Sequence, residues 1–192
     1  MYRAEQDPYC YPGTEVLKNR LNLRTQSELD KFETLSVAKR FQERLPAGKY
    51  TYGHYLSIHR HLFQDVYTWA GRIRTIRMAR GGNWFCYPEY IDGKMRDLFT
   101  LLADNNYLRD IGSDKFANEA AHFIAELNAI HPFREGNGRA QNVFMNILAD
   151  QAGHPLDFER LNTCDMLSAM VASFHGDERP LSVLILGLMR VR

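Results

Sequence analysis

The amino-acid sequence predicts a mostly α-helical protein that carries one β-hairpin. Apolar residues recur at helical spacing in several segments whose starts carry capping residues and whose ends carry glycine or proline. Only residues 72–87 alternate loosely around a glycine-rich turn, which is the pattern of a hairpin. No internal repeat, low-complexity tract or Gly/Ser linker separates two parts of the chain. We therefore expect residues 1–192 to form a single domain.

Capping and breaking signals give the expected helix boundaries. Thr25 and Glu28 form a capping box, in which a hydroxyl and a carboxylate satisfy free amides at a helix start. Apolar residues follow at helical spacing until Pro46 and Gly48 end the run. Further helices are expected over residues 52–65, 88–105, 113–130 with Ser113 as the N-cap, 138–152, 157–174 and 180–192.

Composition and charge exclude several classes of protein. The chain has 192 residues and a formal net charge of +1, from 24 Lys+Arg and 23 Asp+Glu, which argues against nucleic-acid binding through bulk charge. Three cysteines without CxxC spacing favour a reducing cytoplasm and give no zinc site. The start lacks the apolar segment of a signal peptide, and the longest apolar run, Leu181–Met189, is far shorter than the ~20 residues that span a bilayer. We expect a cytoplasmic protein without a membrane partner.

One segment between two expected helices combines the residue types of an anion site. It reads His131-Pro-Phe-Arg-Glu-Gly-Asn-Gly-Arg139. Gly136 and Gly138 flank Asn137 where the next helix should begin. A glycine-bearing loop that leads into a helix turns several backbone N–H groups toward one point, and the helix dipole adds about half a positive charge there.

Three side chains around this loop suit phosphoryl-type transfer. Arg139 offers a planar fork of donors to a phosphate. Glu135 is a hard oxygen ligand that can hold Mg²⁺. His131 has an ordinary pKa of about 6.5, which suits proton abstraction near neutral pH. A single histidine at a helix end, or a Gly-Asn-Gly turn, is usually structural. It is their combination with a carboxylate and an arginine in one loop that indicates chemistry.

The loop resembles the signature of the Fic family, HxFx(D/E)GNGRxxR. Asp7–Tyr9, His61–Arg72 and Glu126–Phe133 are also similar to bacterial Fic domains, so the resemblance covers essentially the whole chain. It implies an all-α bundle with a small β-hairpin flap beside the active-site loop. It further implies transfer of AMP from ATP to a Ser, Thr or Tyr hydroxyl of a target protein.

The resemblance also implies a role for each residue of the loop. His131 would deprotonate the target hydroxyl, and Glu135 would hold Mg²⁺ on the α- and β-phosphates of ATP. Gly136–Gly138 would cradle the phosphates, and Arg139 would neutralise the leaving pyrophosphate. The hairpin would be the flap, which pairs with an extended segment of the target as an added strand. The residues that we expect to dock the target are Thr75, Ile76, Arg77, Trp84 and Phe85.

The chain departs from the family signature at its last position. Asn142 stands where family members usually carry a second arginine that contacts the terminal phosphate of ATP. The loss of a preorganised phosphate donor costs a few kcal/mol of transition-state stabilisation. Asn142 stays a candidate nucleotide-binding residue. Transfer of UMP, GMP or phosphate, and a catalytically silent module that binds a nucleotide or a partner, remain as alternatives.

Regulation in this family often depends on an inhibitory helix with the motif (S/T)xxxE(G/N). Glu135 is the only glutamate followed by Gly or Asn, and the residue four before it is His131 rather than Ser or Thr. The resemblance therefore implies the class in which a separate small antitoxin protein supplies the inhibitory helix. Host-directed effectors share the same catalytic loop, so delivery to a host cell remains an alternative setting.

Two other groups of residues have less specific interpretations. Arginines 72, 74, 77 and 80 lie near aromatic residues and could stack on single-stranded nucleic acid. Arg74 occupies an even position and Arg77 an odd one, so on a strand the two point to opposite faces and do not form one basic face. We therefore interpret these arginines as part of a solvated strand face. His59 and His61 lie two residues apart on an expected helix, which is poor metal geometry, and we interpret both as structural or surface residues.

Overall fold

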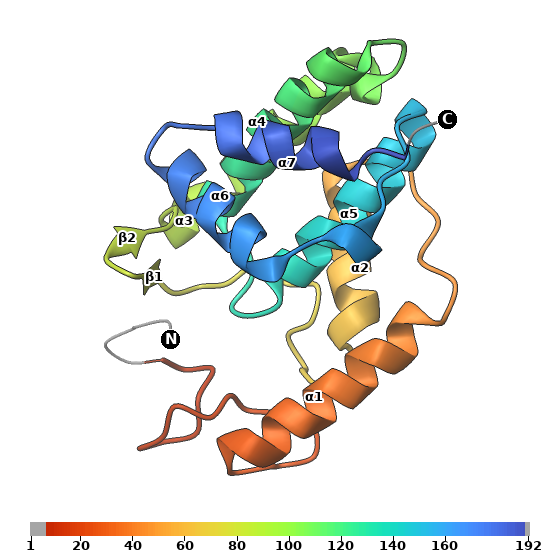
Figure 1. Ribbon diagram of the computed structural model, residues 1–192. Coiled ribbons are helices and arrows are strands. Elements are labelled where there is room, and N and C mark those ends of the chain that lie inside the picture. The colour runs from red at the N-terminus through yellow and green to blue at the C-terminus, as the bar shows by residue number, and fades with distance from the viewer. Residues whose placement is uncertain (1–6, 191–192) are drawn as a thin grey trace. The chain divides into compact units, whose positions relative to one another are not determined.

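The structure, a computed structural model that describes residues 7–190, consists of helices and one small hairpin (Figure 1). Its two short strands, β1 (Ala79–Arg80) and β2 (Asn83–Trp84), are antiparallel, and Ala79 is the partner of Trp84. The all-α fold class with a small hairpin is confirmed. The described helices are α1 (Gln26–Phe41), α2 (Tyr52–Phe63), α3 (Pro88–Asp104), α4 (Ser113–Ile130), α5 (Asn137–Ala152), α6 (Thr163–Phe174) and α7 (Arg179–Leu188), with 3-10 turns at Asn106–Leu108 and Phe158–Arg160.

The chain divides into two compact units. The first unit takes the described residues up to Asp92 together with the loop segment Pro132–Ala140. The second unit takes Gly93–His131 and the described residues from Gln141 onward. The chain therefore passes between the units at three points: inside α3, between His131 and Pro132, and inside α5.

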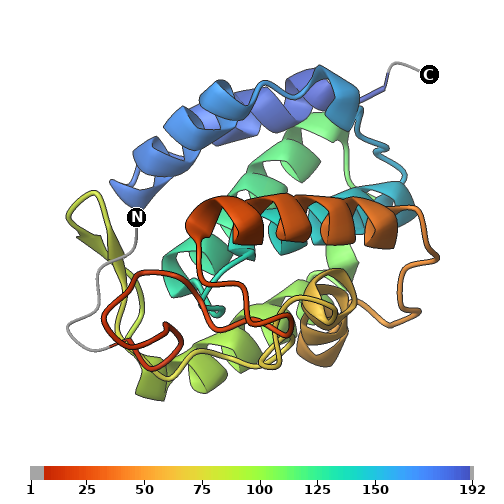
Figure 2. The same ribbon diagram turned by 90° about the horizontal axis from the view of Figure 1, so that it is seen from below.

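The first unit contains α1 packed against α2. Half of the predicted capping box is present, because Thr25 Oγ1 accepts a hydrogen bond from the Glu28 amide. The Glu28 carboxylate accepts from the Thr25 hydroxyl instead of from a backbone amide. Leu29 is buried, but Leu35 is 71% exposed. The apolar residues of α1 therefore recur at helical spacing without forming one continuous buried face. Ahead of α1, residues 7–25 form turns and an isolated bridge between Cys10 and Leu17 (Figure 2).

The hairpin is shorter than residues 72–87, and one of its arginines is not solvated. Arg74 is 1% exposed, and its guanidinium donates to the carbonyl groups of Ile76 and Cys86. The interpretation of Arg74 as part of a solvated strand face is therefore wrong. Strands of two residues leave neighbouring carbonyl groups without ladder partners, and the buried guanidinium supplies the missing donors.

The second unit contains α4 packed against α6 and α7. The apolar stripe expected on α4 is buried throughout, at Phe116, Ala120, Phe123, Leu127 and Ile130. Four helix starts differ from the sequence prediction, and two of them, α5 at Asn137 and α7 at Arg179, differ by one residue. Gly112 rather than Ser113 is the N-cap of α4, and α6 begins at Thr163 rather than 157. α6 begins at Thr163 because the Asn162 side chain accepts hydrogen bonds from the amides of Cys164 and Asp165 and so caps the helix at that point.

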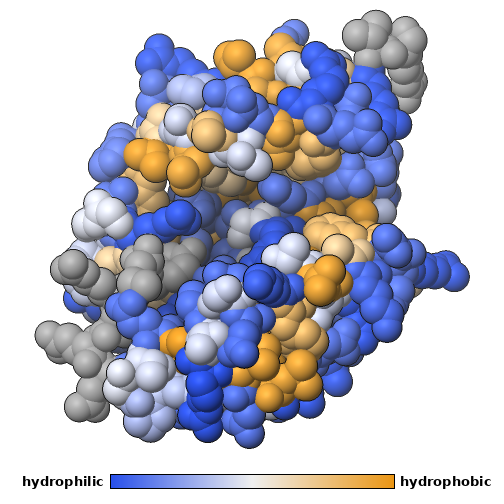
Figure 3. All heavy atoms as spheres, turned by 60° about the horizontal axis from the view of Figure 1, so that its bottom comes forward, coloured by the Kyte–Doolittle hydropathy of each residue, from blue (hydrophilic) through white to orange (hydrophobic). Residues whose placement is uncertain are grey.

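The surface is mixed in character. Figure 3 shows hydrophilic residues with apolar residues interspersed among them. Within residues 7–190, no helix is both long and apolar enough to cross a membrane.

Candidate functional site

His131 ends α4 in an unusual backbone conformation. It is the C-cap residue, with φ 49° and ψ 64° in the left-handed region, and its N–H donates to the Leu127 carbonyl. Pro132 follows it, and the residue before a proline is disfavoured in the right-handed α region. The imidazole Nδ1 lies 3.3 Å from the Asn128 carbonyl oxygen. A carbonyl can only accept, so this contact selects the tautomer with its proton on Nδ1 and leaves Nε2 as the basic nitrogen.

The loop after His131 is closed by the side chain of Asn137. The Asn137 amide group donates to the Phe133 carbonyl (2.7 Å), and its Oδ1 accepts from the Phe133 N–H (2.9 Å). Asn137 is 2% exposed. It is also the first residue of α5, so the sequence prediction of a helix start at this loop is confirmed. Since the side chain is used inside the loop, what Asn137 offers an anion is its backbone N–H in the first turn of a helix.

The two glycines of the loop serve different needs. Gly136 has φ +81°, and a Cβ there would lie 2.3 Å from Phe63 Cζ. Only glycine fits this conformation and this close approach. Among residues 7–190, a Cβ at Gly138 would meet no heavy atom within 4 Å. Packing within the protein therefore does not explain Gly138, and the first turn of α5 is open at this position.

Glu135 is oriented through both its side chain and its backbone. Its Oε1 accepts from the Gly136 N–H at 2.8 Å, and its carbonyl oxygen lies 2.9 Å from His59 Nε2. His59 Nδ1 accepts from the Gly71 N–H, so Nε2 carries the proton and donates to Glu135. Burial lowers the pKa of His59 to about 3, which keeps the ring neutral. The interpretation of His59 as a structural residue is confirmed.

The donor set suits a magnesium ion that arrives with a nucleotide. Within residues 7–190, no group of three or more His, Cys, Asp or Glu side chains is arranged to hold a metal. Magnesium commonly uses one or two protein carboxylates together with substrate phosphates. Glu135, with a side chain 31% exposed, is a carboxylate of this kind.

Arg139, in the first turn of α5, is held by groups from other parts of the first unit. Its Nη2 lies 2.6 Å from Glu33 Oε1 and 3.5 Å from Glu135 Oε1. Its guanidinium carbon lies 4.6 Å from the centre of the Phe63 ring. Sequence reasoning missed Glu33, because it is one of several acidic residues along α1 and no local pattern distinguishes it.

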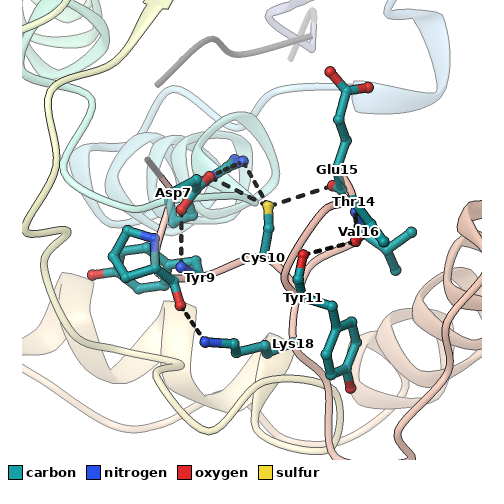
Figure 4. Close-up of polar contacts among 10 residues, drawn as sticks. Asp7, Tyr9, Cys10, Tyr11, Thr14, Glu15, Val16 and Lys18 are labelled. Carbon is teal, nitrogen blue, oxygen red and sulfur yellow. Dashed lines mark hydrogen bonds and ion pairs between the residues drawn. The ribbon is translucent and has the colours of Figure 1, made fainter. Parts of the chain in front are cut away.

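The N-terminal segment is attached to the same loop. Arg134, whose side chain is 8% exposed, donates through Nε to Asp7 Oδ2 at 2.7 Å and forms an ion pair with it. Figure 4 shows the Cys10 thiol beside Asp7, to which it donates at 3.4 Å. Arg134 Nη2 lies 3.9 Å from the same sulfur. Burial and the Asp7 carboxylate raise the pKa of Cys10. Asp7 therefore helps to hold the loop in place through its contact with Arg134. This contact is a structural reason for the similarity of the segment Asp7–Tyr9 to Fic domains.

The flap residues divide by exposure. Thr75, Arg77 and Trp84 are exposed, and Arg77 lies over the ring of Trp84, with 4.0 Å between its guanidinium carbon and the ring centre. Ile76 is half-buried. Phe85 is 7% exposed, so the expected use of its side chain in target docking is not supported. Its N–H instead donates to the Met78 carbonyl and closes the hairpin.

Asn142 follows Arg139 by about one turn of α5 and belongs to the second unit. Its side chain is partly buried. It lines a small apolar cavity together with Met145 and Ile185. Asn142 therefore has an apolar setting, and it is an uncharged residue at the position where the Fic signature has its second arginine.

The fold, the helix-start loop and its histidine are those of a Fic protein. The model of the Fic/DOC family matches residues 49–149, and the chain belongs to this family. The Sinorhizobium fredii protein called "Probable protein adenylyltransferase y4lH" is 51% identical over 185 residues, which cover 96% of each chain. "Protein adenylyltransferase VbhT" of Bartonella schoenbuchensis is 34% identical over 96% of this chain and 39% of its own length. The Bartonella tribocorum BepC structure with bound AMPPNP has a TM-score of 0.86 at 28% identity, over 96% of this chain and 97% of that one.

The two glycines should respond oppositely to alanine. Gly136→Ala introduces left-handed strain and a clash with Phe63, so we expect the free energy of unfolding to fall by about 2–4 kcal/mol. Gly138→Ala adds a methyl group in open space within a helix and should raise the same quantity by up to about 1 kcal/mol. Urea unfolding of both variants measures this difference. Equal destabilisation by the two changes would contradict the packing described for the loop.

His59 should make the protein less stable in acid. The pKa of His59 is about 3 when folded against an ordinary 6.5, so the unfolded chain takes up the proton first as the pH falls. The contribution of His59 is complete above about pH 6.5 and is lost as the pH falls toward 3. Between pH 6.5 and 4.5 we expect a loss of about 2–3 kcal/mol from this residue.

The measurement compares urea unfolding of the wild type and His59→Gln at both pH values. The stability difference between them should shrink on acidification. The exposed His175→Gln variant is the matched control and should keep the slope of the wild type. A His59→Gln slope equal to that of the wild type would show that His59 is not kept neutral.

Proposed function

We propose that this chain is a protein adenylyltransferase, which transfers AMP from ATP to a Ser, Thr or Tyr hydroxyl of a target protein. The observation that carries the proposal is the start of α5, where Gly138 leaves the first turn open and Arg139 adds a cation. A loop of five residues separates this helix start from His131, whose Nε2 is basic. The relatives named as protein adenylyltransferases support the same reaction.

The reaction forms one bond and breaks one at phosphorus. The target hydroxyl oxygen attacks the α-phosphorus of ATP, and the bond from that phosphorus to the pyrophosphate oxygen breaks. His131 Nε2 takes the hydroxyl proton as general base. The N–H groups at the start of α5 and the Arg139 guanidinium stabilise the charge that develops on the phosphates. Glu135 would hold Mg²⁺, which supplies charge neutralisation when it is bound with the nucleotide.

Labelled nucleotides test this proposal. Incubation of a bacterial lysate with the chain and ATP labelled at the α-phosphate should label a protein, and label at the γ-phosphate should not transfer. His131→Ala should reduce the transfer at least about 100-fold, since general bases contribute on this scale. His122→Ala removes an exposed histidine from the same helix and is the matched control.

The other outcomes identify the alternatives that Asn142 raises. Label from the γ-position alone would indicate phosphate transfer and contradict AMP transfer. Transfer from UTP or GTP in place of ATP would reveal a different nucleotide. Binding of a nucleotide with no transfer from any of them would indicate a silent binding module.

The exposed edge of the hairpin is the proposed docking surface for the target. Thr75, Ile76, Arg77 and Trp84 belong to a segment that an extended target strand could pair with through backbone hydrogen bonds. The support is that β1 and β2 form a ladder of only two residues each, so the hairpin is short enough to be extended by an added strand.

A separate antitoxin protein is proposed as the inhibitory partner. The support is that Glu135 is the only glutamate in the sequence followed by Gly or Asn, and it lies in the catalytic loop itself. The wild-type chain should slow bacterial growth, and the His131→Ala variant should not. A small protein from a neighbouring reading frame that carries (S/T)xxxE(G/N) should bind the chain and restore growth. A harmless wild-type chain that captures no such protein would contradict this regulation.

The two units are proposed to make one catalytic domain over residues 1–192. The family match over residues 49–149 crosses every boundary between the units, which supports this interpretation. We place the reaction in the cytoplasm, where cysteines stay reduced, either of the bacterium or of a host cell to which the chain is delivered.

A further inference from the structure

The proposed phosphate-binding arginine is held by a carboxylate that lies outside the catalytic loop. Glu33, on α1, places Oε1 at 2.6 Å from Arg139 Nη2. The guanidinium carbon of Arg139 lies over the Phe63 ring of α2, 4.6 Å from the ring centre. An arginine held by an ion pair and by a ring contact has lost much of the freedom that a long side chain otherwise keeps.

Glu33 is itself fixed from its other side. Its side chain is 13% exposed, and its Oε2 accepts a hydrogen bond from the Tyr67 hydroxyl. Burial and the negative charge of Glu33 raise the pKa of Tyr67, so the hydroxyl keeps its proton and stays a donor. Tyr67 stacks on Trp69, with ring centres 4.4 Å apart, which fixes the tyrosine in turn.

This arrangement restrains Arg139 without using all of its donors. A guanidinium carries five N–H groups, and the ion pairs with Glu33 and Glu135 both converge on Nη2. The Arg139 side chain is 35% exposed, so part of the guanidinium faces solvent. A carboxylate tied to Tyr67 cannot follow Arg139 to a new position, and it therefore sets where the remaining donors point.

We propose that Glu33, supported by Tyr67, is a positioning residue that orients Arg139 for the phosphates of the nucleotide. The proposal rests on the nucleotide-binding role given to this loop under the proposed function. Preorganisation of a donor lowers the cost of binding, because the side-chain freedom is lost before the ligand arrives.

The first experiment measures the affinity for AMPPNP in the presence of Mg²⁺ by calorimetry, without turnover. Glu33→Gln keeps the shape of the side chain and removes its charge, and we expect the Kd to rise about fivefold. Tyr67→Phe should raise it in the same direction by a smaller factor, and Glu33→Asp should recover part of the loss. Asp30→Asn removes the same charge from an exposed position of α1 and should leave the Kd unchanged.

The second experiment shows whether Glu33 acts through Arg139. Glu33→Gln is repeated in an Arg139→Ala background, where it should change the Kd by less than about twofold. An equal loss in both backgrounds would show that Glu33 supports the fold rather than the arginine. A lower Kd for Glu33→Gln in the wild-type background would mean that Glu33 competes with phosphate, and it would overturn the proposal.

Failure of the proposed function is distinguishable from failure of this inference. A chain that binds AMPPNP with the expected dependence on Glu33 and Arg139, but transfers no label, contradicts adenylyl transfer and supports the positioning role. A wild-type chain that does not bind AMPPNP overturns both.

Discussion

The loop between α4 and α5, residues 131–136, is closed by two hydrogen bonds between the Asn137 side chain and the Phe133 backbone. They act as a backbone pair would, because one amide group both donates to and accepts from the same residue. Both partners are buried, so removal of the side chain would leave two main-chain groups without partners in a place that water does not reach. With the loop closed in this way, the chain turns at Gly136 and begins α5 at Asn137.

The other features of the loop follow from this closure. Phe133 is held where its ring stacks on His59, with ring centres 3.7 Å apart. The neutral His59 then bridges the Gly71 amide and the Glu135 carbonyl. A charged imidazole would lose the acceptor at Nδ1, so the low pKa of His59 and the geometry of the loop require each other.

The sequence alone could predict the parts of this structure that local patterns determine. The N-cap at Thr25, the buried stripe on α4 and the helix start after Gly136 each depend on neighbouring residues in the chain. The burial of Arg74 and the contact between Glu33 and Arg139 depend on residues brought together by folding. No spacing rule distinguishes Glu33 from the exposed Asp30 on the same helix, and only the packing of α1 separates them.

Acidic side chains offset the positive charge of Arg139 locally, as acidic and basic residues offset each other over the whole chain. Glu33 and Glu135 both lie beside this one cation, so the three side chains together carry a negative charge. Long-range attraction by side chains therefore does not explain how this loop would hold a polyphosphate. The favourable terms that remain are the amides at the start of α5, the orientation of the guanidinium, and a divalent cation brought with the nucleotide to Glu135. The site depends more on these terms because Asn142, which is uncharged, stands where the family usually has a further arginine. Orientation of the remaining arginine then matters more than it would in a site with two, which is why the fixed carboxylate of Glu33 can aid binding although its charge opposes the ligand.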